Sequence, residues 1–198
     1  MQGLLDIAVQ NSENLHRLIN DLLDMDKLNA GKLQIELVRQ PLEPLLQQAL
    51  QLNQSYAAQY NVQQELGRVD AVEVNVDAQR LGQVLANYLS NAAKFSNAGD
   101  AITLSAVAEN GWVEISVEDR GIGIPEQEQP RIFDKFFQVD SSNTRKRSGS
   151  GLGLAISREL ARRMGGDVGF VSTARVGSRF WIRLPLADVA ADDLRQLH

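Results

Sequence analysis

Residues 87–95 form the first segment whose side chains could do chemistry, and the apolar spacing around them predicts a helix. Asn87, Asn91 and Lys94 fall at i, i+4 and i+7, so they share one face of that helix. Amide oxygens could bind a hard cation there, and the amine could pair with a phosphate. A solvated polar face is the alternative that this spacing alone leaves open.

A second segment follows a β-rich run and contains Asp119, Gly121 and Gly123. An aspartate at the end of a strand could accept a hydrogen bond from an exocyclic amine. The two glycines would let a flat ring approach the backbone closely. The alternative is a tight exit from a strand, which favours the same residue types.

A third segment is rich in glycine and opens a predicted helix, where unpaired N–H groups and the helix dipole favour an anion. It lacks the Gly-Lys-Ser/Thr of a Walker loop, and it does not follow a strand directly as a Rossmann fingerprint would. The segment consists of Gly149, Ser150, Gly151, Leu152 and Gly153.

A basic stretch precedes the glycine-rich segment. Residues 131–147 hold five basic side chains against two acidic ones, a local charge of +3 on a chain whose net charge is −5. Such a loop could close over a polyphosphate, and a solvated basic loop is the alternative. The basic residues are Arg131, Lys135, Arg145, Lys146 and Arg147.

The period of the apolar residues predicts the elements that must position these segments. Asn110-Gly111 joins two β-rich runs and predicts an antiparallel hairpin, and Asp77 is a predicted helix N-cap. We therefore expect an α+β fold, a two-layer α/β sandwich with a mostly antiparallel sheet after a long N-terminal helix. The predicted helices are residues 4–29, 41–60, 78–95 and 152–164, and the predicted strands are residues 33–38, 72–76, 102–109, 112–119, 168–172 and 179–184.

Composition narrows the function classes. The 198 residues are 43% hydrophobic and 23% charged, as in an ordinary globular chain with one main core. The absence of cysteine excludes disulfides, thiolate nucleophiles and cysteine-ligated metals, and the net negative charge disfavours a general affinity for nucleic acid. No apolar run approaches the ~20 residues of a bilayer span. We expect a soluble, cytoplasmic segment.

The three motifs, with Phe133, Phe136 and Phe137 between the second and third, closely resemble the catalytic and ATP-binding domain of sensor histidine kinases. That family is part of a wider one that includes gyrase, the Hsp90 chaperones and MutL. The resemblance covers about residues 30–186. It implies a Bergerat-type ATP-binding fold, with ATP and Mg²⁺ as cofactors.

In that resemblance, Asn91 matches the asparagine that coordinates Mg²⁺ on the nucleotide phosphates, and Asn87 and Lys94 match further N-box positions. Asp119 matches the aspartate that holds the adenine amino group. Residues 138–148 would be the ATP lid, which the phenylalanines of the F box would anchor by packing. The expected catalytic residues are Asn87, Asn91 and Lys94, and the expected nucleotide-binding residues are Asn91, Lys94, Asp119, Gly121, Gly123, Phe133, Arg145, Gly149, Ser150, Gly151, Leu152 and Gly153.

Asn87 discriminates among the relatives. Gyrase, Hsp90 and MutL place a glutamate there, as the base that activates water. An amide cannot take up a proton at neutral pH, so the site favours transfer to an already nucleophilic imidazole over ATP hydrolysis.

Residues 19–31 resemble the second helix of the dimerisation and phosphoacceptor hairpin. The family's acceptor is a histidine followed by an acid on the first helix; Arg17 follows His16, and His198 is terminal, so neither fits. We expect His16 to be an ordinary exposed helix residue. The expected domains are residues 1–30, a partial hairpin; 31–187, the catalytic domain; and 188–198, a tail.

The favoured hypothesis is therefore a kinase core that phosphorylates a histidine on a helix missing from this segment, in the parent protein or in trans, for relay to a response regulator receiver domain. Starting within the hairpin favours a piece of a longer sensor, and the apolar seam of residues 4–25 could mediate a homodimer. A regulatory pseudokinase that docks to a partner kinase is the alternative. A third hypothesis, an ATP-hydrolysing clamp, is disfavoured because Asn87 cannot act as the base that activates water.

Overall fold

A computed structural model describes residues 2–138 and 150–188 of the chain. Its helices and strands follow one another in an order close to the predicted one. They are α1 (Gln2–Asn29), β1 (Val38–Pro41), α2 (Leu42–Gln59), β2 (Gln63–Val69), β3 (Glu73–Val76), α3 (Ala78–Phe95), β4 (Ala101–Glu109), β5 (Trp112–Asp119), the 3-10 turn η1 (Gln129–Arg131), α4 (Gly153–Arg163), β6 (Asp167–Thr173) and β7 (Gly177–Pro185).

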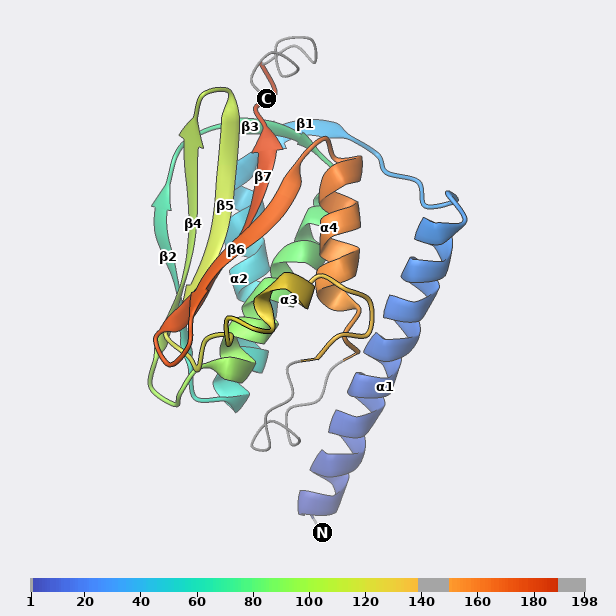
Figure 1. Ribbon diagram of the computed structural model, residues 1–198, viewed down its shortest axis with the longest axis vertical. Helices are drawn as coiled ribbons and strands as arrows, with labels where there is room; N and C mark the ends of the chain where they lie inside the picture. The colour runs from blue at the N-terminus through green and yellow to red at the C-terminus, as the bar shows by residue number, and fades with distance from the viewer. Residues whose placement is uncertain (1, 139–149, 189–198) are drawn as a thin grey trace.

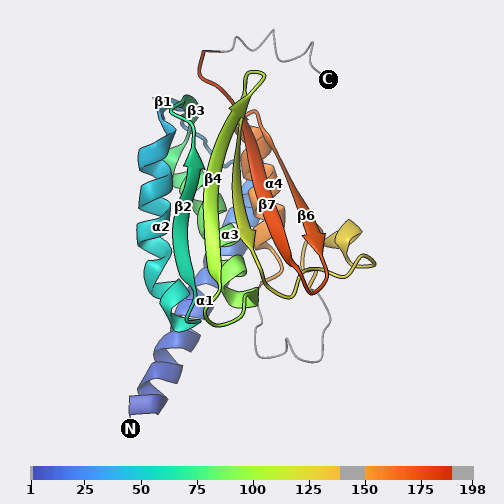
Figure 2. The ribbon, with the colours of Figure 1, turned by 90° about the vertical axis from the view of Figure 1, so that its left-hand side faces the viewer.

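The fold has two layers. Five strands form a sheet in the order β2-β4-β5-β7-β6, in which only β2 and β4 run parallel. Helices α2, α3 and α4 cover one face of this sheet (Figure 2). Helix α1 lies beyond α4, on the side away from the sheet (Figure 1). The expected α+β sandwich with a mostly antiparallel sheet is confirmed.

Helix α3 is the central helix of the covering layer and contacts both α2 and α4. It begins as predicted at Asp77, whose side chain accepts a hydrogen bond from the Arg80 N–H. Its apolar residues recur at helical spacing, so one face is buried while the polar N-box residues lie elsewhere on the helix. The buried apolar residues are Leu81, Val84, Leu85, Tyr88, Leu89, Ala92 and Ala93.

The turn between β4 and β5 and the end of α4 are also close to their predicted positions. Strands β4 and β5 are joined by Asn110 and Gly111, whose φ angles of 50° and 80° suit a two-residue hairpin turn. Helix α4 ends before Gly165, which has a φ of 78°. Gly166 then passes so close to β7 that an added Cβ would lie 2.1 Å from the carbonyl oxygen of Arg183.

Two predictions about strands were wrong. Residues 33–37 alternate between apolar and polar but form no strand, because they cross from α1 to β1 without a neighbouring strand to pair with. The ladder starts only at Val38, which pairs with Val76. Strand β2 was not predicted. It is an edge strand parallel to β4, and its polar residues and Gly67 give it a weak strand pattern.

Helix α1 is docked by its C-terminal part. Met25 and Leu28 are buried, and the Arg163 guanidinium donates hydrogen bonds to the carbonyl oxygens of Leu28 and Leu33. Asp24 pairs with Arg80 on α3 at 3.4 Å. Earlier on α1, large apolar side chains stay exposed, so among the described side chains the packing of α1 lies near its C-terminal end. They are Leu15, Leu18, Ile19, Leu22 and Leu23.

Within residues 2–138 and 150–188, no helix is long and apolar enough to cross a bilayer.

Replacing a buried leucine of α3 with alanine should lower the free energy of unfolding far more than the same replacement of an exposed leucine on α2. Leu89 is fully buried, whereas Leu52 on α2 is 74% exposed. Leu89→Ala should lower the free energy of unfolding by about 2–5 kcal/mol, because it leaves a cavity. Leu52→Ala should change it by no more than about 0.5 kcal/mol. Urea unfolding followed by circular dichroism measures both, and equal effects would contradict the placement of α3.

Candidate functional site

The structure brings the three sequence motifs together around the C-terminal half of α3. The N-terminal turn of α4 packs against Asn87, so closely that a Cβ added to Gly153 would lie 2.3 Å from Asn87 Oδ1. The exit of β5 packs against the end of α3, where the Ile122 N–H donates to the carbonyl of Phe95 at 3.2 Å. The two glycine motifs therefore converge on α3.

Asn87 and Asn91 are half-buried and hydrogen-bonded, so the alternative of a solvated polar face is wrong at these positions. Asn91 Nδ2 donates to Asn87 Oδ1 at 3.4 Å, and Asn87 Nδ2 donates to the hydroxyl of Ser157 on α4 at 3.1 Å. Asn91 Oδ1 has no hydrogen-bond partner among the described residues. This oxygen is the acceptor that a hard cation would use.

Lys94 lies on the same helix, one turn further on. Its side chain is buried, with Nζ 5.0 Å from the centre of the Phe95 ring. A buried ammonium favours a negatively charged ligand, because burial disfavours a charge that has no opposite charge nearby. Ser96 follows, and its buried hydroxyl oxygen has no hydrogen-bond partner within the described part of the chain. A polar ligand or a water molecule would satisfy it.

Asp119 is a buried carboxylate at the end of β5. Its Oδ1 atom accepts hydrogen bonds from the backbone N–H groups of Gly121 at 2.8 Å and Ser178 at 3.3 Å. Burial raises the pKa of Asp119, and these two hydrogen bonds only partly oppose the rise. Both bonds go to Oδ1, which leaves Oδ2 to accept from a ligand amine.

Ser178 is a residue of the site that the sequence analysis missed. It pairs with Asp119 across β5 and β7, and its hydroxyl lies 2.9 Å from the hydroxyl of Ser172. Only the register of the two strands places it there, and no local motif marks it.

The glycines of the second motif have a packing reason. A Cβ on Gly121 would lie 2.2 Å from the Phe95 carbonyl oxygen, and one on Gly123 would lie 2.1 Å from that of Thr173. Gly123 also has a φ of 62°, which glycine adopts at no steric cost. Both glycines therefore fix the loop after Asp119 against its neighbours.

The F box (Phe133, Phe136 and Phe137) and the glycine-rich segment are joined by a backbone hydrogen bond. The Phe136 N–H donates to the Gly151 carbonyl at 2.9 Å. Phe133 packs as expected: its ring meets Phe170 edge-on at 6.0 Å, and Arg158 of α4 lies over it. Phe136 is 66% exposed. Its predicted packing against the lid stays a prediction, because the lid lies largely outside the described residues.

The positively charged lid falls largely outside the described residues. Arg145 of the lid and Gly149 of the glycine-rich segment both lie outside the described residues, so their predicted contacts with a nucleotide stay predictions. Its two flanks are described, and both touch α1. The Ser150 hydroxyl donates to Asp21 Oδ2 at 2.7 Å and accepts from the Leu152 N–H, while Lys135 Nζ donates to Asn29 Oδ1 at 2.9 Å.

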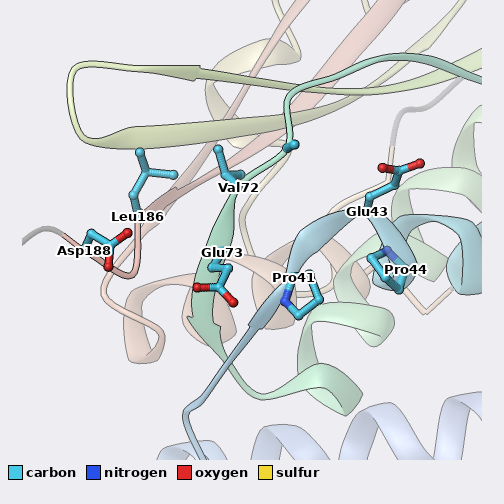
Figure 3. Close-up of a pocket in the computed structure, with 8 residues that line it drawn as sticks. Pro41, Glu43, Pro44, Val72, Glu73, Leu186 and Asp188 are labelled. Carbon is cyan, nitrogen blue, oxygen red and sulfur yellow. The ribbon is translucent and has the colours of Figure 1, made fainter.

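A separate hollow of about 600 Å³ lies by the β1–β3 ribbon and the chain beyond β7 (Figure 3). Three carboxylates line it, those of Glu43, Glu73 and Asp188, together with apolar side chains such as Pro41 and Val72. Arg39 bridges Glu73 and Asp188. This acidic lining repels phosphate, and the hollow contains none of the motif residues.

Comparisons with known proteins agree with this geometry. Residues 76–188 match the family described as "Histidine kinase-, DNA gyrase B-, and HSP90-like ATPase". The signal transduction histidine-protein kinase BarA of Escherichia coli (strain K12) is 38% identical over 188 residues, 92% of this chain and 20% of that protein. Sensor protein GacS of Pseudomonas syringae pv. syringae is 35% identical over 195 residues, 96% of this chain and 22% of that protein.

Solved structures share this fold. Full-length ShkA in complex with AMPPNP has a TM-score of 0.80 and 32% identity, over 96% of this chain and 40% of that one. The catalytic domain of the histidine kinase ThkA has a TM-score of 0.64 and 25% identity, over 76% of this chain and 95% of that one.

The chain therefore belongs to the family of histidine kinase-, DNA gyrase B- and HSP90-like ATPases. Within it, the fold and these relatives are those of sensor histidine kinases, which confirms the resemblance seen in the sequence motifs. The chain spans about a fifth of the length of the curated relatives it matches.

Burial of Asp119 predicts a specific dependence of stability on pH. A carboxyl whose pKa is higher in the folded than in the unfolded protein lowers stability at neutral pH, and this cost fades as the pH falls towards the ordinary value of 3.8. Asp119→Asn keeps an oxygen for the Gly121 and Ser178 N–H groups. We expect a higher Tm than the unsubstituted chain at pH 7, and a smaller difference at pH 4.5. Thermal unfolding at the two pH values measures this, and a difference that grows on acidification would contradict it.

Proposed function

We propose that this chain is the kinase core of a sensor histidine kinase, which binds Mg²⁺-ATP and transfers the γ-phosphoryl group to a histidine on a separate helix. One observation carries the proposal. A buried carboxylate, an amide oxygen without a partner among the described residues and the glycine-rich start of α4 are joined through contacts with α3. These are the groups that an amine, a cation and a phosphate chain require.

Each group has a distinct task in this proposal. Asp119 accepts a hydrogen bond from the adenine amino group and so selects the base. Asn91 offers its Oδ1 to Mg²⁺, and Lys94 with the N–H groups at the start of α4 holds the phosphates. When bound, the metal would neutralise the negative charge on the phosphate oxygens in the transition state of phosphoryl transfer. Catalysis then rests on position and charge.

The donor set of the described residues fits Mg²⁺ only if the nucleotide supplies further oxygen ligands. No group of three or more histidine, cysteine, aspartate or glutamate residues in the described ranges could hold a metal alone. Mg²⁺ usually binds through one or two protein ligands together with substrate phosphates and water. One amide oxygen on α3 is consistent with that pattern.

The contacts of Asn87 support phosphotransfer over hydrolysis. Its nitrogen donates to Ser157 and its oxygen accepts from Asn91, so both ends of the amide are engaged in structure. Neither end can remove a proton from water at neutral pH. A neutral imidazole needs no such base, because its ring nitrogen is already nucleophilic.

The acceptor is proposed to be a histidine on a helix that pairs with α1. His16 is exposed, and its ring nitrogen Nδ1 lies 3.1 Å from Asn20 Nδ2 on the same helix, as expected for an ordinary helix residue. The exposed leucines and Ile19 on α1 would pack against that helix and against a second copy of the chain. A response regulator receiver domain would then take the phosphoryl group.

Transfer to a supplied acceptor tests the proposal. The chain is incubated with labelled ATP, Mg²⁺ and a hairpin peptide that carries the family's acceptor histidine, and acid-labile label on the hairpin is counted. Asn91→Asp and Asp119→Asn should each lower transfer at least about a hundredfold, because removing one preorganised charge-stabilising or positioning group costs that much. Asp188→Asn, in the distant acidic hollow, is the matched control and should leave transfer unchanged.

Three results would overturn the proposal. Undiminished transfer by Asp119→Asn would show that the base is not recognised there. Binding of ATP without any phosphohistidine, on every acceptor hairpin offered, would favour the regulatory alternative, and rapid release of inorganic phosphate would favour a hydrolase.

A further inference from the structure

A directed series of hydrogen bonds runs from helix α4 to the proposed metal ligand on α3. The hydroxyl of Ser157 donates to the carbonyl of Gly153 at 2.9 Å. The Ser157 oxygen accepts from Asn87 Nδ2 at 3.1 Å, and Asn87 Oδ1 accepts from Asn91 Nδ2 at 3.4 Å. Ser157 is buried, with only 2% of its surface exposed.

The bond from Ser157 to Gly153 sets the direction of this series. A carbonyl oxygen can only accept, so in this contact the Ser157 hydroxyl donates its single proton to Gly153. The hydroxyl oxygen must then accept, and the only donor that Asn87 can offer is its NH₂ group. This turns Asn87 Oδ1 towards Asn91, which must in turn present its own NH₂ group. The remaining atom, Asn91 Oδ1, therefore points away from the series.

We propose that Ser157 is a positioning residue that fixes the orientation of the Asn91 amide through Asn87, so that Asn91 presents oxygen to Mg²⁺. This inference rests on the proposed function. The two ends of an asparagine amide have nearly the same shape, so packing alone distinguishes them poorly. Hydrogen-bond polarity does distinguish them, and an NH₂ group turned towards a cation would repel it.

Gly153 makes this arrangement possible. A Cβ at position 153 would lie 2.3 Å from Asn87 Oδ1 and 3.1 Å from its Nδ2. Any larger residue would push the Asn87 amide out of reach of Ser157 or of Asn91. The third glycine of the motif therefore acts here through the amide on α3.

Without the Ser157 hydroxyl, the side-chain amide of Asn87 could flip, so that its nitrogen and oxygen exchange places. Its NH₂ group could then donate to Asn91 Oδ1 and compete with the cation for that oxygen. Removal of a group that orients a metal ligand typically costs 10–100-fold in metal affinity. We expect Ser157→Ala to lower the Mg²⁺-dependent gain in nucleotide affinity about tenfold, with affinity in EDTA unchanged.

Calorimetry with a non-hydrolysable ATP analogue, in Mg²⁺ and in EDTA, measures this gain. The matched control is Ser90→Ala on α3, because Ser90 also donates its hydroxyl to a helix carbonyl, that of Asn87, but bonds to no amide side chain among the described residues. Ser90→Ala should keep the full Mg²⁺-dependent gain. Equal losses in Mg²⁺ and in EDTA for Ser157→Ala would show a packing role only, and would overturn the inference.

The substitution Asn87→Asp provides a rescue that a packing role does not predict. A carboxylate has no N–H, so Asn91 must present its NH₂ group to it whether or not Ser157 is there. Ser157→Ala should therefore cost about tenfold in the chain that keeps Asn87, and nothing measurable in the chain that carries Asn87→Asp. The comparison within each background removes the direct effect of the added charge. An undiminished cost in the Asn87→Asp background would contradict the inference.

A readout without nucleotide separates this inference from the proposed function. In the ¹⁵N-labelled protein, Ser157→Ala should shift the side-chain NH₂ resonances of Asn87 and Asn91, and Ser90→Ala should not shift those of Asn91. Unmoved Asn91 resonances in Ser157→Ala would overturn the inference. Moved resonances in a chain that binds no ATP analogue at all would overturn the proposed function instead.

Discussion

The close approach of helices α3 and α4 is the constraint on which the rest of the site depends. Gly153 has no Cβ, so the first turn of α4 lies directly against the Asn87 amide. That contact brings Ser157 within hydrogen-bonding distance of α3 and places the N-terminal end of α4 beside the N box. The absence of a side chain at Gly153 thus lets the proposed anion-binding end of α4 lie against the proposed cation-binding face of α3.

Close packing also shapes the part of the site where Asp119 is proposed to bind the base. Gly121 lets the loop after β5 contact the end of α3, and two backbone N–H groups hold one oxygen of Asp119. Burial raises the pKa of this carboxyl, so the protein keeps a group that is unfavourable for stability at neutral pH. Such a cost is expected where a residue serves recognition. Helix α1 adds a further connection, because Asp21 and Asn29 contact both flanks of the lid.

The sequence predicted those parts of the fold whose signals are local. Helix α3, its Asp77 cap and the Asn110-Gly111 hairpin follow from spacing and turn chemistry. The roles that the motifs assign to Asn91 and Asp119 stay predictions. Strand β2 was missed because its pairing with β4 is distant in sequence and its residues are polar. Ser157 and Ser178 were missed for a related reason: helix docking and strand register bring them to Asn87 and Asp119, and no motif marks either serine.

In the proposed site, Asn91 holds the cation with its oxygen while Asn87 stays hydrogen-bonded to the Asn91 nitrogen. A crystal structure with a non-hydrolysable ATP analogue and Mn²⁺, whose anomalous scattering marks the metal, would show both groups. We expect Mn²⁺ at about 2.2 Å from Asn91 Oδ1, an ordinary metal–oxygen distance, and the analogue's adenine amine against Asp119. A metal bound to Asn87 instead, or a nucleotide that avoids Asp119, would contradict this expectation.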